Sequence, residues 1–293
     1  MEIIDALEKF YQYLYAEKGS SKTTVEAYDN DLKQFFKVFS NKASTDDFTS
    51  NDLSDYISVA LNNGLSVSTV LRRLSSLRQF YSFLKREGII NIEIKKIDSP
   101  KVIKTLPNVL SYEEVDALLD APNINKDDGI RDKAMLEIMY ASGLRVSELL
   151  NLQMKNVNFL RSFIEVIGKG SKARRIPVGE FAMDYLAHYI NNVRKRNIGA
   201  NTKFVFLNRY GKTLSRQYFF KKIKAYAAQV GITSNVSPHT LRHSFATHML
   251  ENGAELISLQ EMLGHENLST TQIYTHISTK RIKSAYDLYI NNK

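Results

Sequence analysis

The sequence predicts a mainly helical protein with a small β-hairpin, divided into two domains of unequal size. Three observations lead to this fold class. At 293 residues the chain is longer than one average domain, and its 43% hydrophobic content is enough for two cores. Helical periodicity runs through residues 1–90, whereas a segment rich in lysine and proline follows at residues 91–107. Beyond it, glycines separate two short β-prone runs in an otherwise helical pattern.

The first domain, residues 1–90, is predicted to be a bundle of four helices. Apolar residues recur at helical spacing, as in Tyr28, Leu32 and Phe35, and either Ser21 or Thr23 is expected to cap the second helix. The expected helices are Ile3–Glu17, Lys22–Phe39, Thr49–Asn62 and Val67–Glu87. The last helix is basic, so it offers either a DNA-facing side or an ordinary solvated face. Its cations are Arg72, Arg73, Arg78, Lys85 and Arg86.

Residues 91–107 are expected to form an extended linker. They contain four lysines and two of the five prolines of the chain, and the helical period fails there. The second domain, residues 108–293, then begins with a helix whose start is marked by the capping-box pattern of Ser111 and Glu114. Two domains joined by a stiff basic tether suggest a clamp around a DNA duplex.

In the second domain, local signals predict two helices and a hairpin. A helix at Asp132–Ala141 is expected to break at Gly143, and a helix from about Pro238 to Asn252 has Ser237 as its predicted cap. His239 and Arg242 are three residues apart on this second helix and therefore share a face. The hairpin strands are expected at Phe163–Ile167 and Arg174–Val178, with the tip at Gly168-Lys169-Gly170.

The positive charge of the chain is concentrated in the second domain. The formal net charge is +9 and the isoelectric point is about 9.4, while residues 1–105 are nearly neutral. Between Arg161 and Lys224 there are fifteen basic side chains and three acidic ones, Glu165, Glu180 and Asp184. Such a stretch predicts a phosphate-facing surface, although single lysines and arginines of this kind also serve only to solvate helices.

Composition excludes several functional classes. The chain has no cysteine, so disulfides, thiol catalysis and cysteine-bound metals are excluded. Its first ten residues are acidic and amphipathic, unlike a secretory signal. No stretch approaches the roughly 20 apolar residues that span a bilayer. A cytoplasmic protein without a membrane partner is therefore expected.

Six residues in the second domain together suit one kind of substrate. They are Arg145, Lys169, His239, Arg242, His265 and Tyr274. A phosphodiester accumulates negative charge in its transition state, and planar guanidinium groups can hold that charge with two hydrogen bonds each. The set also contains a phenol, which becomes a nucleophile when its proton is removed. This combination predicts cleavage of nucleic acid through a protein-linked intermediate.

In order and in local context, the six residues resemble the catalytic residues of the tyrosine site-specific recombinases. The surrounding phrases are similar to those of the bacterial Xer branch of this family, and the resemblance covers nearly the whole chain. The phrases are RDKAMLEIMYASGLRVSELLNL, VIGKGSKARRIPV, SPHTLRHSFATHMLENGA and LQEMLGHENLSTTQIYTH. The opening KGSSKTTVEAYDNDLKQFF and LRRLSSLRQFYSFL likewise resemble the N-terminal DNA-clamping domain of that family.

The resemblance implies a role for each of the six residues. Arg145 and Arg242 would hold the scissile phosphate, and His265 would hydrogen-bond it, while His239 would take part in proton transfer. Tyr274 would attack the phosphorus to form a 3′-phosphotyrosyl bond. Lys169 would protonate the departing 5′ oxygen, with Lys172 as a competing candidate. The reaction would need no cofactor and no metal.

The resemblance also implies the partners. Family members act on double-stranded DNA with a specific core site, as homo- or heterotetramers on two duplexes. A second Xer recombinase and an FtsK-type translocase are further expected partners, and the expected task is the resolution of chromosome dimers. An integrase or invertase of a mobile element, or an inactive DNA-binding protein on the same fold, remains the alternative. The XerC or XerD role is left open.

Three smaller questions stay open in the sequence. His239, His243 and His248 are spaced like metal ligands on a helix, which leaves a metal-dependent nuclease as a further alternative. Glu148, one turn after Arg145, is a candidate to orient an arginine or histidine. The tail after Tyr274 carries an apolar stripe that packs either on its own domain or on a neighbouring subunit. The stripe consists of Ile282, Ala285, Tyr286, Leu288 and Tyr289.

Overall fold

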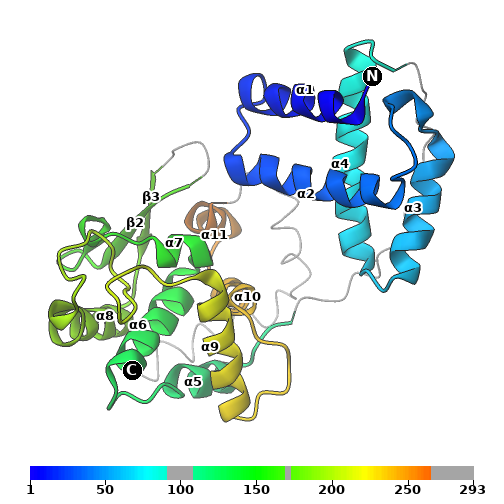
Figure 1. Cartoon of the computed structure of the whole chain (residues 1–293). Coiled ribbons are helices and arrows are strands. Elements are labelled where there is room, and N and C mark those ends of the chain that lie inside the picture. Colours follow the sequence, from blue (N-terminus) through cyan, green and yellow to red (C-terminus); the bar gives the residue numbers. More distant parts are fainter. Residues whose placement is uncertain (91–107, 169–172, 265–293) are drawn as a thin grey trace. The chain divides into compact units, whose positions relative to one another are not determined.

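The computed structural model describes residues 1–90, 108–168 and 173–264, and it divides the chain into two compact units (Figure 1). The first unit spans Met1–Thr105 and the second spans Leu106–Lys293. The expected linker at residues 91–107 lies outside the described residues, as does the predicted hairpin tip. Within the described ranges, every helix is too short or too polar to span a lipid bilayer.

The first unit contains the four helices that the sequence predicts. They are α1 (Ile3–Ala16), α2 (Lys22–Val38), α3 (Ser50–Asn62) and α4 (Val67–Arg86), with a short 3₁₀ turn at Thr45–Asp47. Ser21 is the cap of α2, because its side chain accepts a hydrogen bond from the main-chain N–H of Thr24 at 3.2 Å. The α4 helix is capped in the same way by Ser66. Local signals were therefore sufficient to place these helices.

The core of the first unit is built from aromatic rings. Phe10 and Phe80 meet edge to face with their centroids 5.3 Å apart, and Phe35 meets Tyr56 similarly at 5.1 Å. All four rings are almost fully buried. Edge-to-face contacts place the positive rim of one ring against the negative face of the next, which adds to the hydrophobic gain. A small bundle thus obtains a dense core from few large side chains.

The second unit is also mainly helical, with one small sheet. Its helices are α5 (Tyr112–Asp120), α6 (Asp127–Ser142), α7 (Val146–Leu150), α8 (Glu180–Asn192), α9 (Arg216–Gln229), α10 (Pro238–Glu251) and α11 (Leu256–Leu263). The strands are β1 (Val157–Asn158), β2 (Phe163–Ile167) and β3 (Ala173–Pro177), paired antiparallel in that order. The predicted hairpin is confirmed as β2 and β3. The two-residue strand β1 is too short to show alternation, so the sequence did not reveal it.

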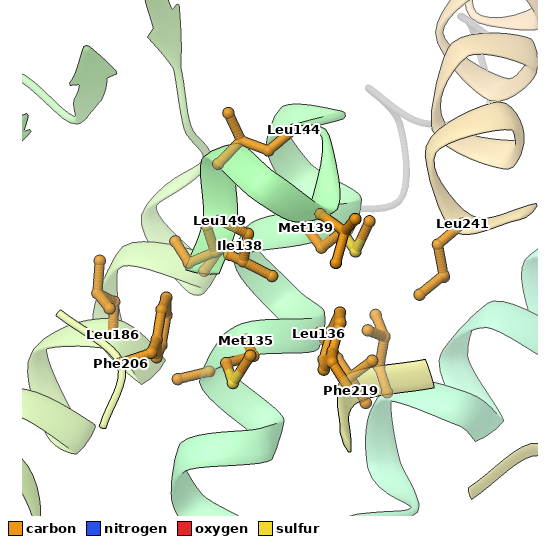
Figure 2. Close-up of a cluster of buried hydrophobic side chains, with 14 of the residues drawn as sticks. Met135, Leu136, Ile138, Met139, Leu144, Leu149, Leu186, Phe206, Phe219 and Leu241 are labelled. Carbon is orange, nitrogen blue, oxygen red and sulfur yellow. The ribbon is translucent and has the colours of Figure 1, made fainter. Parts of the chain in front are cut away.

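Helix α6 packs against α8, α10 and α5, and Figure 2 shows its buried side chains beside Leu186 of α8 and Leu241 of α10. Its apolar side chains contact neighbours on several sides, including Met135, Leu136 and Ile138, which are fully buried. Charged residues of the same helix, such as Arg131 and Asp132, are buried as well, so burial follows no apolar stripe that the sequence would reveal. The sequence predicted that this helix starts at Asp132, and this was wrong: the helix begins at Asp127.

The basic stretch from Arg161 to Lys224 does not form one surface. Arg194 is 5% exposed and donates hydrogen bonds to the carbonyls of Phe204 at 2.9 Å and Thr202 at 2.7 Å, so it organises a loop. Lys222 pairs with Asp128, and Arg174 is also internal. The expectation that the whole stretch faces phosphate was wrong for Arg194 and Arg174, since both side chains are largely buried and their donors are directed at protein acceptors.

Candidate active site

Three of the six predicted site residues lie in the described part of the chain. Arg145 precedes α7, and both His239 and Arg242 lie on α10. Lys169, His265 and Tyr274 lie outside the described residues, and so does the apolar stripe of the tail. The described part of the site therefore consists of these two arginines, this histidine and the groups that contact them.

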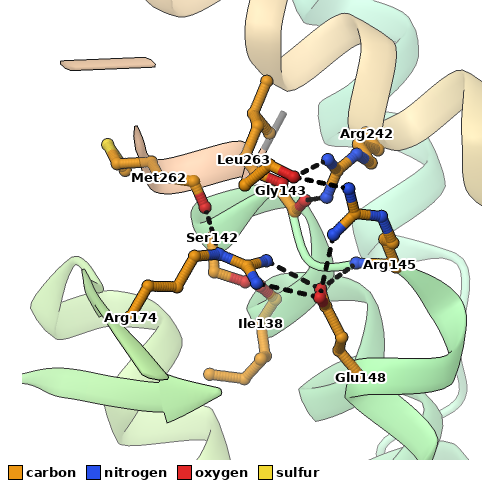
Figure 3. Close-up of polar contacts among 10 residues, drawn as sticks. Ile138, Ser142, Gly143, Arg145, Glu148, Arg174, Arg242, Met262 and Leu263 are labelled. Atoms are coloured by element: carbon orange, nitrogen blue, oxygen red, sulfur yellow. Dashed lines mark hydrogen bonds and ion pairs between the residues drawn. The ribbon is translucent and has the colours of Figure 1, made fainter. Parts of the chain in front are cut away.

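Arg145 is held by groups from two parts of the unit (Figure 3). It is the N-cap residue of α7, and its main-chain N–H donates to Oε2 of Glu148 at 2.8 Å. Its Nη1 donates to Oε1 of Glu148 at 3.1 Å, and its Nη2 donates to the carbonyl of Gly264 at 2.8 Å. The side chain is nevertheless 38% exposed. Arg145 is thus oriented by protein acceptors and still accessible to a substrate.

Glu148 orients arginines, as the sequence suggested. Its carboxylate is 9% exposed and receives hydrogen bonds from Arg145 and from both Nη atoms of Arg174, at 3.0 and 2.9 Å. Burial acts to raise the pKa of Glu148, but the hydrogen bonds from Arg174 and Arg145, together with their charges, outweigh it and lower the pKa below its ordinary value. The carboxylate therefore stays ionised between two guanidinium groups.

Arg174 is a residue of this site that the sequence reasoning missed. It lies on β3, is 13% exposed, and donates from Nε to the carbonyl of Met262 at 2.7 Å. In the sequence it belongs to the run Lys172-Ala-Arg-Arg, which reads as a solvated basic segment. The signal that was available is strand alternation, because Arg174 is two residues before the buried Ile176 and hence shares its inward face.

Arg242 is buried on α10 and binds main-chain oxygens. Its Nη1 donates to the carbonyl of Gly143, and its Nη2 donates to the carbonyl of Leu263 at 2.8 Å. The three arginines thereby bind three consecutive carbonyls at the end of α11, namely those of Met262, Leu263 and Gly264. The last carbonyls of a helix have no partner within the helix and carry its negative dipole end, so cations are favoured there.

Two glycines make this convergence sterically possible. Gly143 ends α6 with a φ of 59°, and a Cβ added there would lie 2.4 Å from the Phe245 ring. Gly264 ends α11 with a φ of 64°, and a Cβ there would lie 3.1 Å from Nη1 of Arg174. Left-handed backbone of this kind favours glycine. A side chain at Gly143 would thus collide with Phe245, and one at Gly264 would press on the Arg174 guanidinium.

His239 lies in the first turn of α10 and is exposed, whereas Arg242 on the same helix is buried. The helix begins as predicted, with Ser237 accepting from the N–H of Thr240 at 3.2 Å and Pro238 in the first position. The two residues share the helix but not the same degree of exposure. His239 is accessible to a substrate and Arg242 is fixed beneath it in the fold.

The histidines with metal-ligand spacing have different surroundings. His248 is buried, stacks on the ring of Tyr112 with centroids 3.9 Å apart, and shares a 2.7 Å hydrogen bond between Nδ1 and the Tyr140 hydroxyl. Burial lowers the pKa of His248 below its ordinary value, so its neutral form is favoured. His243 is partly buried, and burial lowers its pKa too. Within the described ranges, the histidines and carboxylates form no group suited to a metal ion.

The described arrangement suits an anionic group with planar, charge-delocalised geometry. Arg145 and Arg242 bind adjacent carbonyls, Gly264 and Leu263, so their guanidinium groups lie close to each other (Figure 3). Guanidinium groups bind phosphate oxygens with two parallel hydrogen bonds, and orientation before binding lowers the reorganisation cost during reaction. The predicted pair of phosphate-binding arginines is therefore brought together by the fold.

Comparison with known proteins gives matches over both units. Residues 7–88 match the phage integrase N-terminal SAM-like domain, and residues 108–281 match the phage integrase family. A curated relative, the tyrosine recombinase XerD of Staphylococcus aureus, is 42% identical over 287 residues that cover 97% of each chain. The protein of the same name from Oceanobacillus iheyensis is 42% identical over 290 residues, again with 97% of each chain covered.

Solved structures agree with these matches. The XerH site-specific recombinase, in a post-cleavage complex with its palindromic difH substrate, is 25% identical with a TM-score of 0.76. That alignment covers 97% of this chain and 84% of XerH. The Tn1549 transposon integrase in complex with transposon right end DNA has a TM-score of 0.79 over 99% of this chain and 100% of its own. Its 18% identity supports likeness of fold alone.

Proposed function

The chain belongs to the phage integrase family as a Xer-type tyrosine recombinase, and we propose that it resolves chromosome dimers through the residues named below. A tyrosine recombinase cuts and rejoins DNA strands at specific sites. One observation carries the assignment of the site: Arg145 and Arg242 converge on two adjacent carbonyls at the end of α11. Two oriented planar cations at one place are what a phosphodiester transition state requires.

In the proposed reaction, the phenol oxygen of Tyr274 attacks the scissile phosphorus while Arg145 and Arg242 hold its non-bridging oxygens. The phenolic proton leaves through His239, and His265 donates a hydrogen bond to the phosphate. The bond from phosphorus to the 5′ oxygen breaks, and Lys169 protonates that oxygen. A 3′-phosphotyrosyl bond and a free 5′ hydroxyl result, so the reverse step needs no external energy source.

The proposal is tested with a nicked suicide substrate that traps the covalent intermediate. The full-length protein should form an adduct that resists SDS, and Tyr274→Phe should form none because it lacks the attacking oxygen. Tyr286→Phe, a second tyrosine of the C-terminal segment, serves as the matched control and should still form the adduct. An adduct with Tyr274→Phe would refute the choice of nucleophile. The adduct should also form in the presence of EDTA, since arginines rather than a metal ion hold the phosphate.

The choice between Lys169 and Lys172 has its own test. Replacing the bridging 5′ oxygen of the substrate by sulfur gives a leaving group that departs without a proton. Lys169→Ala should cleave ordinary DNA slowly and recover most of its rate on the sulfur substrate, because the missing acid is then not needed. Lys172→Ala should cleave both substrates at comparable rates. Recovery of Lys172→Ala in place of Lys169→Ala would assign the acid to Lys172.

We further propose that the protein acts in the cytoplasm on two DNA duplexes as a tetramer, either alone or with a second Xer recombinase. The relative XerH is described in complex with a difH substrate, and two relatives carry the name XerD. An FtsK-type translocase is the proposed activator. Chromosome-wide footprinting of the protein should give one strong site near the replication terminus. Footprints confined to the ends of a mobile element would instead favour an integrase.

A further inference from the structure

We propose that Arg174 is a positioning residue of strand cleavage, which fixes the guanidinium of Arg145 through Glu148 and through the end of α11. This inference rests on the proposed function of Arg145 as a phosphate-binding residue. Arg174 itself is not proposed to contact DNA. Its role follows from burial, from the geometry of its hydrogen bonds, and from the separation of the elements that it joins.

The guanidinium of Arg174 is committed to protein acceptors. Nη1 and Nη2 bind the two oxygens of Glu148 at 3.0 and 2.9 Å, and Nε binds the carbonyl of Met262 at 2.7 Å. A two-pronged contact of this kind fixes the orientation of the carboxylate as well as its position. The side chain is 13% exposed, compared with 38% for Arg145. Arg145 is thus the accessible member of the pair, and Arg174 is the internal one.

Glu148 transmits this orientation to Arg145. With both of its oxygens held by Arg174, the carboxylate still accepts from the main-chain N–H and from Nη1 of Arg145, at 2.8 and 3.1 Å. Without Arg174, the carboxylate would be free to rotate or to form a closer pair with Arg145. Either change would move the guanidinium that the proposed function places on the phosphate.

The second connection runs through α11. Arg174 binds the carbonyl of Met262, and Arg145 binds the carbonyl of Gly264, two residues later. Gly264 lies so close to Arg174 that a Cβ there would be 3.1 Å from its Nη1. One guanidinium therefore joins β3 to α7 and to the end of α11, which are the two elements that bind the side chain of Arg145 (Figure 3).

This role requires an arginine. A lysine would keep the positive charge but offers a compact ammonium that cannot contact both carboxylate oxygens and Met262 in one plane. Arg174→Lys is therefore the informative substitution, since it retains charge and length. Arg175→Lys is the matched control, because Arg175 is the next residue of β3, is 69% exposed, and pairs with Glu165 on the surface.

The experiment measures the single-turnover rate of adduct formation by the full-length protein at saturating suicide substrate. We expect Arg174→Lys to slow cleavage about 10- to 100-fold, because even a small misplacement of a positioning group can slow a reaction by up to about 100-fold, with little change in DNA affinity. Arg175→Lys should cleave like the unmodified protein. A normal rate for Arg174→Lys, or a loss that appears only in DNA affinity, would overturn the proposal.

A second substrate separates positioning from simple loss of folded protein. A methylphosphonate at the scissile position has no negative charge on its non-bridging oxygen, so it depends less on Arg145. The defect of Arg174→Lys should shrink to about 2- to 3-fold on this substrate, because only the charge-stabilising step is impaired. An equal defect on both substrates would indicate a merely structural role and overturn the proposal.

The route through Glu148 is tested with a double variant. If Arg174 acts through Glu148, then Arg174→Lys should change the cleavage rate by less than about 2-fold when Glu148→Gln is already present. Full additivity of the two defects would contradict this route. If the unmodified protein forms no adduct, the proposed function is refuted. If it forms the adduct normally and Arg174→Lys cleaves at the same rate, only the positioning role of Arg174 is refuted.

Discussion

Two arginines, one in each unit of the protein, are held by different kinds of acceptor. On α4 of the first unit, Arg72 pairs with the carboxylate of Asp31, which is 1% exposed. In the second unit, Arg242 donates to the main-chain carbonyls of Gly143 and Leu263. A carboxylate orients a guanidinium and cancels its charge, whereas a carbonyl orients it and leaves the charge in place. The two hydrogen bonds from Arg242 to Gly143 and Leu263 therefore orient its guanidinium without themselves cancelling its charge.

Arg145 and Arg174 lie between these two cases. They share one carboxylate, Glu148, and each also binds a carbonyl at the end of α11. One negative charge thus faces two positive ones. The three groups together keep a net positive charge, and Arg145 is the more exposed of the two arginines. The contrast is between a guanidinium paired with a carboxylate, as in Arg72, and one that binds carbonyls next to a second, more exposed arginine, as in Arg242 beside Arg145.

The largest effect is expected when a carbonyl-bound arginine loses its planar fork. Arg242→Lys should slow adduct formation about 100- to 1000-fold, as for the loss of one oriented donor to a transition-state oxyanion. Arg72→Lys is the counterpart in the first unit and should change the rate less than about 3-fold. Single-turnover cleavage at saturating DNA measures both. Equal losses for the two variants would break the distinction.

Next in size is the removal of the shared carboxylate. Glu148→Gln leaves two guanidinium groups without their countercharge, and we expect a loss of about 2 kcal/mol in the free energy of unfolding. The loss of unfolding free energy is modest because Arg145 is partly exposed and water screens its ion pair with Glu148. Urea unfolding near neutral pH measures it. Asn151→Asp, at the exposed residue directly after α7, should lose about 1 kcal/mol or less, because it removes only one hydrogen bond, to the carbonyl of Ser147.

The same variant predicts a change in pH dependence. The pKa of folded Glu148 lies below its ordinary value of 4.5, so the unfolded chain takes up the proton first as the pH falls. The stabilisation by this carboxylate is complete above pH 4.5 and is lost as the pH falls through the lower pKa of the folded state. Glu148→Gln should therefore lose less stability on acidification than the unmodified protein. Parallel acid-unfolding curves would contradict the ion pair.

A smaller effect is expected from the carboxylate of the first unit. Oδ2 of Asp31 accepts from Arg72 and, at 2.9 Å, from the Ser76 hydroxyl. Asp31→Asn should reduce the free energy of unfolding by about 1–2 kcal/mol without altering the cleavage rate at saturating DNA. Asp29→Asn, on the same helix but 29% exposed, should lose less than about 0.5 kcal/mol. A slower cleavage rate in Asp31→Asn would show that this ion pair also serves the reaction.

The smallest effect concerns close approach at the end of α11. Gly264 and Gly231 both have positive φ, 64° and 76°, but only at Gly264 would a Cβ approach another side chain, that of Arg174. Gly231→Ala should lose about 1 kcal/mol through backbone strain alone. Gly264→Ala should lose a few tenths more and cleave DNA a few-fold more slowly. Identical thermal unfolding and cleavage of the two variants would show that the Arg174 contact carries no energy.

Much of the fold was predictable because its signals are local. The helices of the first unit, the caps at Ser21 and Ser111, and the hairpin of β2 and β3 follow from periodicity and from residues a few positions apart. The start of α6 was not predictable, because α6 is buried on many sides and no apolar stripe marks where it begins. The strand β1 was missed because two residues cannot display an alternating pattern.

For the site, the sequence supplied the order Arg145, Lys169, His239, Arg242, His265 and Tyr274 and a resemblance that gave each residue a proposed role. It also supplied Glu148 as an orienting carboxylate. It did not identify Arg174, which looked like one more cation in a basic run. Nor did it show that Arg194 serves a loop, because an arginine near others carries no local mark of its acceptor.

The amino-acid order alone thus determined the helical class, the hairpin and the types of side chain available for phosphoryl transfer. Only the tertiary structure decided which arginines point inward and what they bind. The physical reason is sequence separation: Arg145 meets Gly264 across 119 positions, and Arg242 meets Gly143 across 99. Propensity and capping act over a single turn, whereas these contacts exist only after packing has brought α6, α10 and α11 together.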